Sequence, residues 1–392
     1  MRYALLIALG MIFGLAGAQR LTLLPTPDGF YGGTPYYVAH NGSTVVGTVR
    51  DTYNFYGVYW ADGHVNFIPS FVSGSVSSTA TGVGGVSADG SIVAVVGNPF
   101  GYLWNRQTGQ FVDLYPRNRS RAPQPRALSA DGRTVVGTIQ GNSGQVWFLW
   151  REGEGLDIHR RLSGMVVSPD GETLYGVLED GIPIPARATD LCEAETLVEQ
   201  GAPLDARVVR VSHNERYLLL RPGNTLNVAY VWEIPTGTTY TIVPPYDYVF
   251  ATAIADDGTV YGYYRPTSSP TVIAPFRWSV QGGFQDLHEA FPCALPDGYA
   301  YWTVRDVSPD GRYIVGEVKR LSDNATLPFF MDTGGCLPGD VDCNGCVDDA
   351  DLLMVLFQFG ATGRGLNADL NCDAVVDDAD LLMVLFHFGS GC

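Results

Sequence analysis

Residues 128–137, LSADGRTVVG, decide the fold, because this segment recurs with variations along most of the chain. Asp131-Gly132 joins two apolar runs, and Asp-Gly is a turn signal since glycine tolerates positive φ. The β-branched residues of 134–137 favour a strand. An aromatic run, WFLW at 147–150, and a shorter run, GLDI at 155–158, follow. The segment therefore predicts a unit of about four short strands.

Six further copies of this unit are spaced 39 to 53 residues apart, at Asn41-Gly42, Asp89-Gly90, Asp170-Gly171, Asn214-Glu215, Asp257-Gly258 and Asp310-Gly311. Five copies carry a tryptophan at the equivalent place in the aromatic run: Trp60, Trp104, Trp150, Trp232 and Trp278. Phe330 replaces it in the seventh copy, and the fourth copy lacks it. Repeats of this length with about four strands each are typical of β-propeller blades, which must stack to bury their faces.

The ends of the repeat array favour a closed ring. The seventh copy stops near Met331, before its last short strand, whereas an unassigned strand of that type, RLTLLP, occupies residues 20–25. Pairing the two would remove an open sheet edge. We therefore expect a mainly β protein with a seven-bladed propeller over residues 19–333, closed by its N-terminal strand. Two packed β-sandwiches are the alternative.

Some copies contain Ser-Pro-Asp-Gly, at 168–171 and 308–311, together with Val-Val-Gly strand ends. In these residues the chain resembles the bacterial extracellular HAF-type repeats and the TolB-like propellers. The resemblance implies a propeller with a binding or scaffold role, without implying one particular activity.

A second repeat follows a short linker at 334–339. Residues 340–351 read DVDCNGCVDDAD and residues 369–380 read DLNCDAVVDDAD. Each is followed by LLMVLF, one variable residue and Phe-Gly, a sequence that favours a helix up to its closing glycine. Oxygen side chains at positions 1, 3, 5, 9 and 12 are typical of an EF-hand calcium loop, in which position 7 contributes a backbone carbonyl. The sequence therefore predicts two Ca²⁺ ions, held by Asp340, Asp342, Asn344, Cys346, Asp348 and Asp351 in the first loop and by Asp369, Asn371, Asp373, Val375, Asp377 and Asp380 in the second.

The two sites are expected to differ in strength. Position 6 takes a sharp turn, and it is Gly345 in the first loop but Ala374 in the second. A residue other than glycine at positive φ costs about 1 kcal/mol. We expect the second loop to bind its ion more weakly.

Aspartate at position 12, a spacing of 29 residues between the loops and one helix after each loop resemble a type I dockerin, over residues 340–392. The resemblance implies docking onto a cohesin-like protein through residues around positions 10, 11, 17, 18 and 22. Those positions hold Asp349-Ala350, Leu356-Phe357 and Ala361 in the first repeat, and Asp378-Ala379, Leu385-Phe386 and Ser390 in the second. The hydroxyl pair and basic residue usual in dockerins are not among them.

Residues 1–18 have the features of a secretory signal peptide: Arg2, an apolar run from Ala4 to Leu15, and Ala16-Gly17-Ala18 for cleavage. A membrane anchor is the alternative, although the run is shorter than the roughly 20 residues that span a bilayer. We expect a secreted protein, extracellular or on the cell surface, with no transmembrane segment. A formal net charge of −17 argues against nucleic acid as a partner.

The seven cysteines allow several disulfides, since secretion permits them. Cys336 and Cys392 flank the calcium repeat, so a clasp between them is expected. Cys343 and Cys372 share loop position 4 and could pair, or one of them could pair with Cys346. An odd count leaves at least one thiol free or paired between chains.

No catalytic set is evident. The six histidines are scattered, with His40, His159 and His288 at strand ends or turns, and Ser-x-Asp-Gly recurs as a turn. The acidic pairs Glu152/Glu154 and Glu193/Glu195 have no defined separation. The sequence therefore favours a non-catalytic binding or scaffold protein whose propeller binds an extracellular glycan or protein. The alternative is a polysaccharide hydrolase or lyase.

Overall fold

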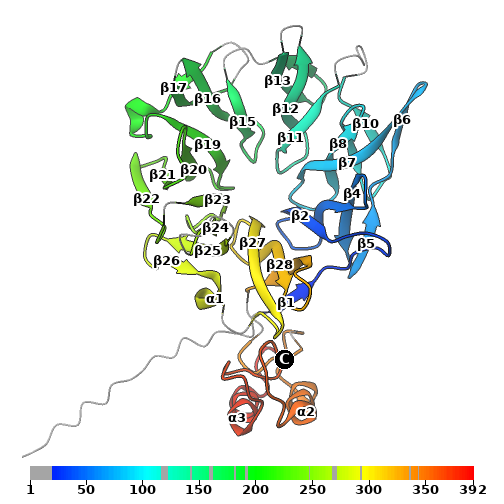
Figure 1. Cartoon of the computed structure of the whole chain (residues 1–392), viewed down its shortest axis with the longest axis vertical. Helices are drawn as coiled ribbons and strands as arrows, with labels where there is room; N and C mark the ends of the chain where they lie inside the picture. The colour runs from blue at the N-terminus through cyan, green and yellow to red at the C-terminus, as the bar shows by residue number, and fades with distance from the viewer. Residues whose placement is uncertain are drawn as a thin grey trace, which may run out of the picture.

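The computed structural model describes residues 20–115, 122–141, 144–158, 162–180, 182–189, 193–246, 248–266, 272–291, 294–334, 337–342 and 344–392. Seven antiparallel sheets are arranged around a central axis as a seven-bladed β-propeller, and a small helical module follows at the C-terminus (Figure 1). The predicted fold is confirmed, and the two-sandwich alternative is wrong. The signal peptide predicted at 1–18 lies outside the described residues.

Each blade uses consecutive strands, from the centre outward. Blade 1 comprises β2 (Gly33–Val38), β3 (Val45–Arg50), β4 (Phe55–Ala61) and β5 (His64–Phe67). Blade 2 comprises β7 (Val76–Val86), β8 (Ile92–Asn98), β9 (Tyr102–Asn105) and β10 (Phe111–Asp113), with β6 (Phe71–Ser73) paired to β7. Blade 3 comprises β11 (Gln124–Leu128), β12 (Thr134–Gly141), β13 (Gly144–Arg151) and β14 (Gly155–Ile158).

Blade 4 comprises β15 (Ser163–Val167), β16 (Leu174–Asp180), β17 (Ile182–Ala188) and β18 (Glu195–Thr196), followed by the 3-10 turn Val198–Gln200. Blade 5 comprises β19 (Ala206–Val211), β20 (Tyr217–Pro222), β21 (Ala229–Glu233) and β22 (Thr238–Ile242). Blade 6 comprises β23 (Val249–Ile254), β24 (Val260–Tyr264), β25 (Ala274–Ser279) and β26 (Gly283–Asp286), followed by α1 (Leu287–Ala290).

Blade 7 is completed by the N-terminal strand. It comprises β27 (Tyr299–Val307), β28 (Tyr313–Arg320) and β29 (Thr326–Asp332), and β1 (Arg20–Leu23) pairs antiparallel with β29. In that register Leu21 lies opposite Met331, and Leu23 lies opposite Phe329. The expected ring closure is therefore confirmed.

The recurring turn between the first and second strands of a blade is stabilised locally. In blade 3 the Ser129 hydroxyl donates to the Asp131 carboxylate and accepts from the Thr134 amide at 2.9 Å. Gly132 takes φ +77°, a value that glycine adopts without strain. Serine donates in the same way to the Asp or Asn two residues later in four other blades: Ser87, Ser168, Ser212 and Ser308. These contacts explain why the motif is visible in the sequence.

The core lies between neighbouring blades. The five aligned tryptophans are all at most 7% exposed, and they pack on the valines and aromatic residues of adjacent sheets. Trp60, for example, packs with Val315 of blade 7 and donates to the Pro25 carbonyl at 2.7 Å. No blade buries its faces alone, so the ring must close to complete the core.

The C-terminal module consists of α2 (Asp349–Gln358) and α3 (Asp378–His387), each preceded by an acidic loop. Equivalent residues of the two repeats form its small core: Val341 with Leu370, Val347 with Val376, and Val355 with Val384. Within the described ranges, no helix is long and apolar enough to span a bilayer.

Candidate functional site

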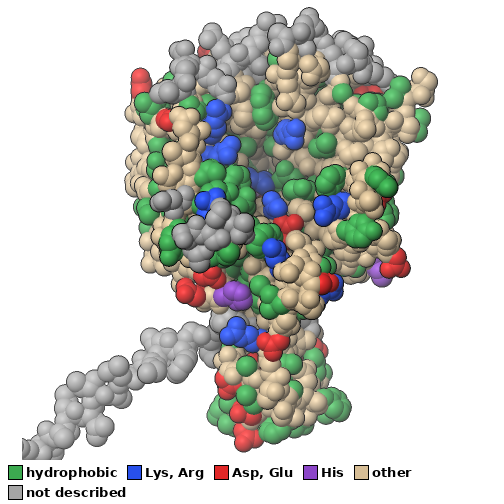
Figure 2. Space-filling view, in the orientation of Figure 1, with side chains coloured by type: hydrophobic (Ala, Val, Ile, Leu, Met, Phe, Trp, Pro, Cys, Tyr) green, Lys and Arg blue, Asp and Glu red, His purple; other side chains and the backbone are tan. Residues whose placement is uncertain are grey.

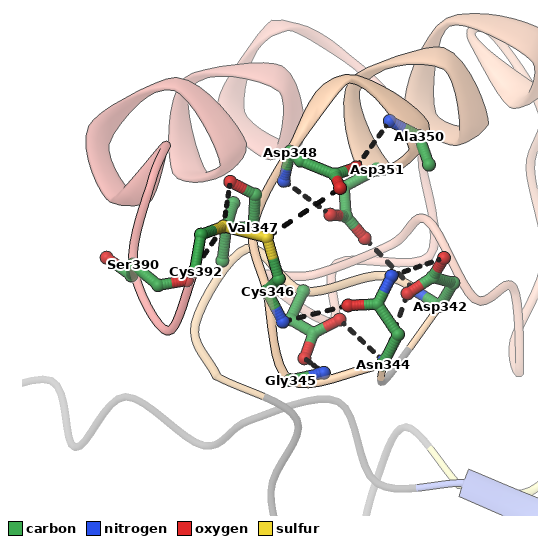
Figure 3. The surroundings of a disulfide bond; sticks show 11 residues. Asp342, Asn344, Gly345, Cys346, Val347, Asp348, Ala350, Asp351, Ser390 and Cys392 are labelled. Carbon is green, nitrogen blue, oxygen red and sulfur yellow. Dashed lines mark hydrogen bonds between the residues drawn. A yellow bond between two sulfur atoms is a disulfide. The ribbon is translucent and has the colours of Figure 1, made fainter.

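The first acidic loop brings three carboxylates together. Oxygens of Asp340, Asp342 and Asp351 all lie within 4.8 Å of one another, and Asp340 and Asp351 are only 1% and 0% exposed. Asp351 sits at the third residue of α2, where its carboxylate accepts from the amides of Val341 and Asp348 at 2.6 and 2.9 Å. Asp340 accepts from the Gly345 amide at 2.9 Å, so the loop folds around these oxygens. Figure 3 shows Asp342 and Asp351 in this loop.

The other predicted side chains of this loop serve its backbone. Asn344 accepts from the Cys346 amide at 2.8 Å, and Asp348 caps α2 by accepting from the Ala350 amide at 2.8 Å. Cys346 lies at position 7, where only its carbonyl could serve an ion, because its sulfur is in a disulfide.

The second loop repeats this arrangement. Asp380 accepts from the amides of Leu370 and Asp377 at 2.6 and 2.9 Å, and Asp369 accepts from Ala374 at 2.9 Å. Two ligand positions exchange side-chain type between the loops, since Asn371 replaces Asp342 and Asp373 replaces Asn344. Val375 follows at position 7, donating to Asp373 at 2.9 Å, and Asp377 caps α3. Burial, together with the nearby Asp380 charge, raises the pKa of Asp369.

This donor set suits a hard cation. Burying several carboxylates side by side is unfavourable unless a positive charge compensates them. The first loop supplies three carboxylates in reach of one point, all oxygen donors of the kind that Ca²⁺, Mg²⁺ and Mn²⁺ prefer. The acidic cluster could therefore bind a metal ion.

The backbone at position 6 is as expected in both loops. Gly345 has φ +91° and Ala374 has φ +68°. A Cβ added at Gly345 would meet nothing within 4 Å. Alanine would therefore be disfavoured there by the positive φ alone and not by a steric clash. Ala374 carries the strain predicted for it.

The two repeats are interlocked. The Val347 amide of the first loop donates to the Ser390 carbonyl after α3, and the Val376 amide of the second loop donates to the Ala361 carbonyl after α2, both at 2.9 Å. Each loop therefore rests on the end of one helix, and the module folds as one unit.

A disulfide joins Cys346 to Cys392, with the two Cα atoms 4.7 Å apart (Figure 3). The expected Cys336–Cys392 clasp is therefore wrong. The position-7 residue of the first loop reaches the last residue because the end of the chain packs against Val347. Cys372 is also disulfide-bonded. Cys336 and Cys343 lie outside the described residues.

The outer faces of α2 and α3 expose large apolar side chains. Phe357 and Phe386, at equivalent positions, are 83% and 80% exposed. The rest of this surface is equally duplicated, as Leu353, Leu356 and Phe359 on one helix and Leu382, Leu385 and Phe388 on the other. We call these eight residues the helix surface. Contiguous exposed apolar residues of this kind mark interaction sites.

The central channel of the propeller holds a polar set that the sequence did not identify as a group. Arg210 of β19 lies 3.5 Å from Asp306 of β27, and its guanidinium lies over the Tyr37 ring of β2 at 5.0 Å. Asp306 also accepts from the Val38 amide at 3.1 Å. Burial raises the pKa of both Asp306 and Tyr37. These contacts join three blades across the axis.

His40 and His213 meet at the mouth of this channel, with ring centroids 4.4 Å apart. Burial and the neighbouring His213 lower the pKa of His40 to about 4. From the sequence we expected His40 to be an ordinary turn residue. The turns of blades 1 and 5 are far apart along the chain, so nothing there indicates that the two histidines meet. No strong sequence signal marks the pair.

One member of each acidic pair considered for glycosidic chemistry has an arginine partner. Glu152 forms an ion pair with Arg133 at 3.3 Å, and Glu195 forms one with Arg187 at 2.9 Å. Ser87 belongs to a turn, as predicted. His159 lies outside the described residues.

Comparisons with solved structures agree with the fold. The chain is similar to an oligogalacturonate lyase from Vibrio parahaemolyticus (TM-score 0.52, 12% identity, covering 80% of this chain and 93% of that one) and to an oligogalacturonate lyase in complex with manganese (TM-score 0.53, 11% identity, 81% and 94%). It is also similar to the β-propeller domain of the Trilobed protease from Pyrococcus furiosus (TM-score 0.51, 12% identity, 79% and 95%). At these identities the likeness shows the propeller fold alone. No model of a protein family and no curated protein sequence matches the chain.

Proposed function

We propose that this chain is a secreted, non-catalytic binding and scaffold protein. Its propeller presents a binding face, and its C-terminal module docks it onto a partner protein in a calcium-dependent way. The observation that carries this proposal is the helix surface, in which Phe357 and Phe386 are at least 80% exposed at equivalent positions. Leaving eight large apolar side chains in water is unfavourable, and a partner that covers them would remove that cost.

The resemblance to dockerins gives the partner its class, a cohesin-like domain. Apolar residues at positions 17 and 18 replace the polar ones usual there, so the matching surface of the partner should be apolar as well. Docking should depend on calcium because Asp351 and Asp380 occupy the first turns of the same helices that carry the helix surface. Two bound Ca²⁺ ions would fix both helices relative to their loops.

The test is binding of the full chain to a panel of immobilised cohesin domains, in calcium and in chelator. Binding should require calcium. Because the two faces are equivalent, Phe357→Asp or Phe386→Asp alone should weaken it only slightly, and the double variant should abolish it. Val72→Asp changes a residue that is 64% exposed on the propeller and is the matched control. Undiminished binding by the double variant, or binding in chelator, would contradict the proposal.

The alternative function, catalysis on an extracellular polysaccharide, would draw on the channel set of Tyr37, Arg210 and Asp306. The pocket around these residues has a volume of about 140 Å³, which is small beside the roughly 300–1,000 Å³ of ordinary ligand pockets. Two of the similar folds are oligogalacturonate lyases, so a glycan panel that includes galacturonate oligomers is the direct test. Turnover that is lost on Arg210→Gln would favour catalysis.

A further inference from the structure

The arginines on the two faces of the propeller differ in how often they pair with a carboxylate. One face carries the recurring turns, and there the arginine before a second strand pairs with a carboxylate: Arg133 with Glu152, Arg216 with Glu233, and Arg312 with Asp332. The second strands end on the opposite face. There Arg320 pairs with Asp323 at 2.7 Å, and three further arginines lie at or next to strand ends: Arg50, Arg221 and Arg265. Among the described residues, none of these three has a carboxylate partner.

This second face is a local concentration of positive charge on an acidic protein. Lys and Arg side chains gather around the middle of the propeller in Figure 2, whereas Asp and Glu lie mostly toward its edge and on the C-terminal module. The chain as a whole has a formal net charge of −17. Unpaired arginines that persist against such a balance indicate an anionic ligand.

A groove of about 690 Å³ opens between blades 1 and 7 on this face. Its blade 1 wall brings one arginine and two aromatic residues together. The Tyr31 amide donates to the Arg50 carbonyl at 2.8 Å, and Phe55 lies directly opposite Arg50 in the β3–β4 pair. Tyr31 and Phe55 are 63% and 56% exposed. Two exposed aromatic side chains therefore lie beside an arginine that has no carboxylate partner among the described residues.

The blade 7 wall is held rigidly. Arg305 donates twice to one oxygen of Glu317, at 3.0 and 2.7 Å, and Glu317 also accepts from Thr34 and Thr303. Trp302 also lines this wall, and its ring centre lies 3.3 Å from the ammonium of the neighbouring Lys319. Arg305 and Trp302 are thus held in place before any ligand arrives, which lowers the entropic cost of binding.

We propose that this groove binds a carboxylated polysaccharide, a chain of uronic acid residues. The inference rests on the proposed binding function and names its ligand class. Sugar rings present flat apolar C–H faces that stack on aromatic side chains, and Arg50 offers the planar fork that matches a carboxylate. A uronate chain carries one negative charge on each sugar ring, and the groove likewise offers both aromatic side chains and arginines. Duplex nucleic acid, with one charge per about 1.7 Å, needs a denser array of cations than this groove provides.

The experiment uses the full chain with a galacturonic acid oligomer, and with its methyl ester as the uncharged match, at constant calcium. The acid form should bind, more weakly at high salt, and the ester should bind at least tenfold more weakly. Arg50→Gln should weaken binding about tenfold, as loss of a charged hydrogen bond implies, and Phe55→Ala should weaken it several-fold. Arg133→Gln removes the same charge from the other face and should change binding less than twofold.

Equal binding of ester and acid would overturn the proposal, as would an unchanged Arg50→Gln variant. Tighter binding of single-stranded DNA would identify a nucleic-acid site instead, since stacking platforms with cations also suit that ligand. Because Arg50 and Phe55 are exposed, an unchanged thermal midpoint confirms that each variant folds. The Phe357→Asp/Phe386→Asp variant should keep full glycan binding, so failure of docking and failure of the groove are distinguishable.

Discussion

At the residue scale, Gly345 and Ala374 make the two acidic loops unequal. Both take positive φ, where alanine is strained by about 1 kcal/mol and glycine is not. Ala374→Gly should therefore tighten calcium binding at the second loop about fivefold. Isothermal titration of the full chain would measure the change.

The reverse substitution is the matched control. Since a Cβ at Gly345 would meet no atom within 4 Å, Gly345→Ala adds strain without a clash and should weaken the first site by a similar factor. Two sites of equal affinity in the unchanged protein, or weaker binding by Ala374→Gly, would show that backbone strain does not set their order.

At the scale of elements, β1 determines whether the ring is closed. Leu21 packs on the core of blades 6 and 7, whereas Thr22 points outward and is exposed. Leu21→Asp should destabilise the propeller by about 1–2 kcal/mol, because Leu21 is partly buried, and it should promote aggregation by uncovering the edge of β29. Thr22→Asp, one residue away, should do neither. Chemical denaturation and light scattering would compare the two, and equal effects would mean that β1 does not close the ring.

The elements also show what the sequence could predict. The turn at Asp131-Gly132 is stabilised by its sequence neighbours Ser129 and Thr134, so its pattern is local and can be recognised in each repeat. The acidic loops could be predicted for the same reason, because their contacts join residues that are close in the sequence. The channel contact of Arg210 with Asp306 and the groove between Arg50 and Trp302 join residues from different blades. Only the closed ring brings them together, so no spacing in the sequence marks them.

At the scale of the whole molecule, the propeller and the C-terminal module have separate cores and different sources of stability. The propeller is held by apolar packing between blades, whereas the module combines a small core of equivalent valines with buried carboxylates. They meet just before β27, where the Arg364 amide donates to Asp297 at 3.2 Å and the small Gly365 packs against Pro296. Because the two cores share no residue, each part should unfold on its own.

Chelation should therefore unfold the module and spare the propeller. Without a cation, Asp340, Asp342 and Asp351 repel one another, and at a calcium concentration of 100 times Kd the ion contributes about 2.7 kcal/mol. Calorimetry should show a C-terminal transition that moves to lower temperature in chelator, beside a propeller transition that does not move. The Cys346–Cys392 disulfide limits the unfolded module, so under reducing conditions the C-terminal transition should move to lower temperature both with and without calcium. Asp351→Asn should reproduce the effect of chelator, and Asp310→Asn, in a propeller turn, should instead lower only the propeller transition. A C-terminal transition indifferent to calcium would mean that the acidic loops are structural turns and that docking does not depend on an ion.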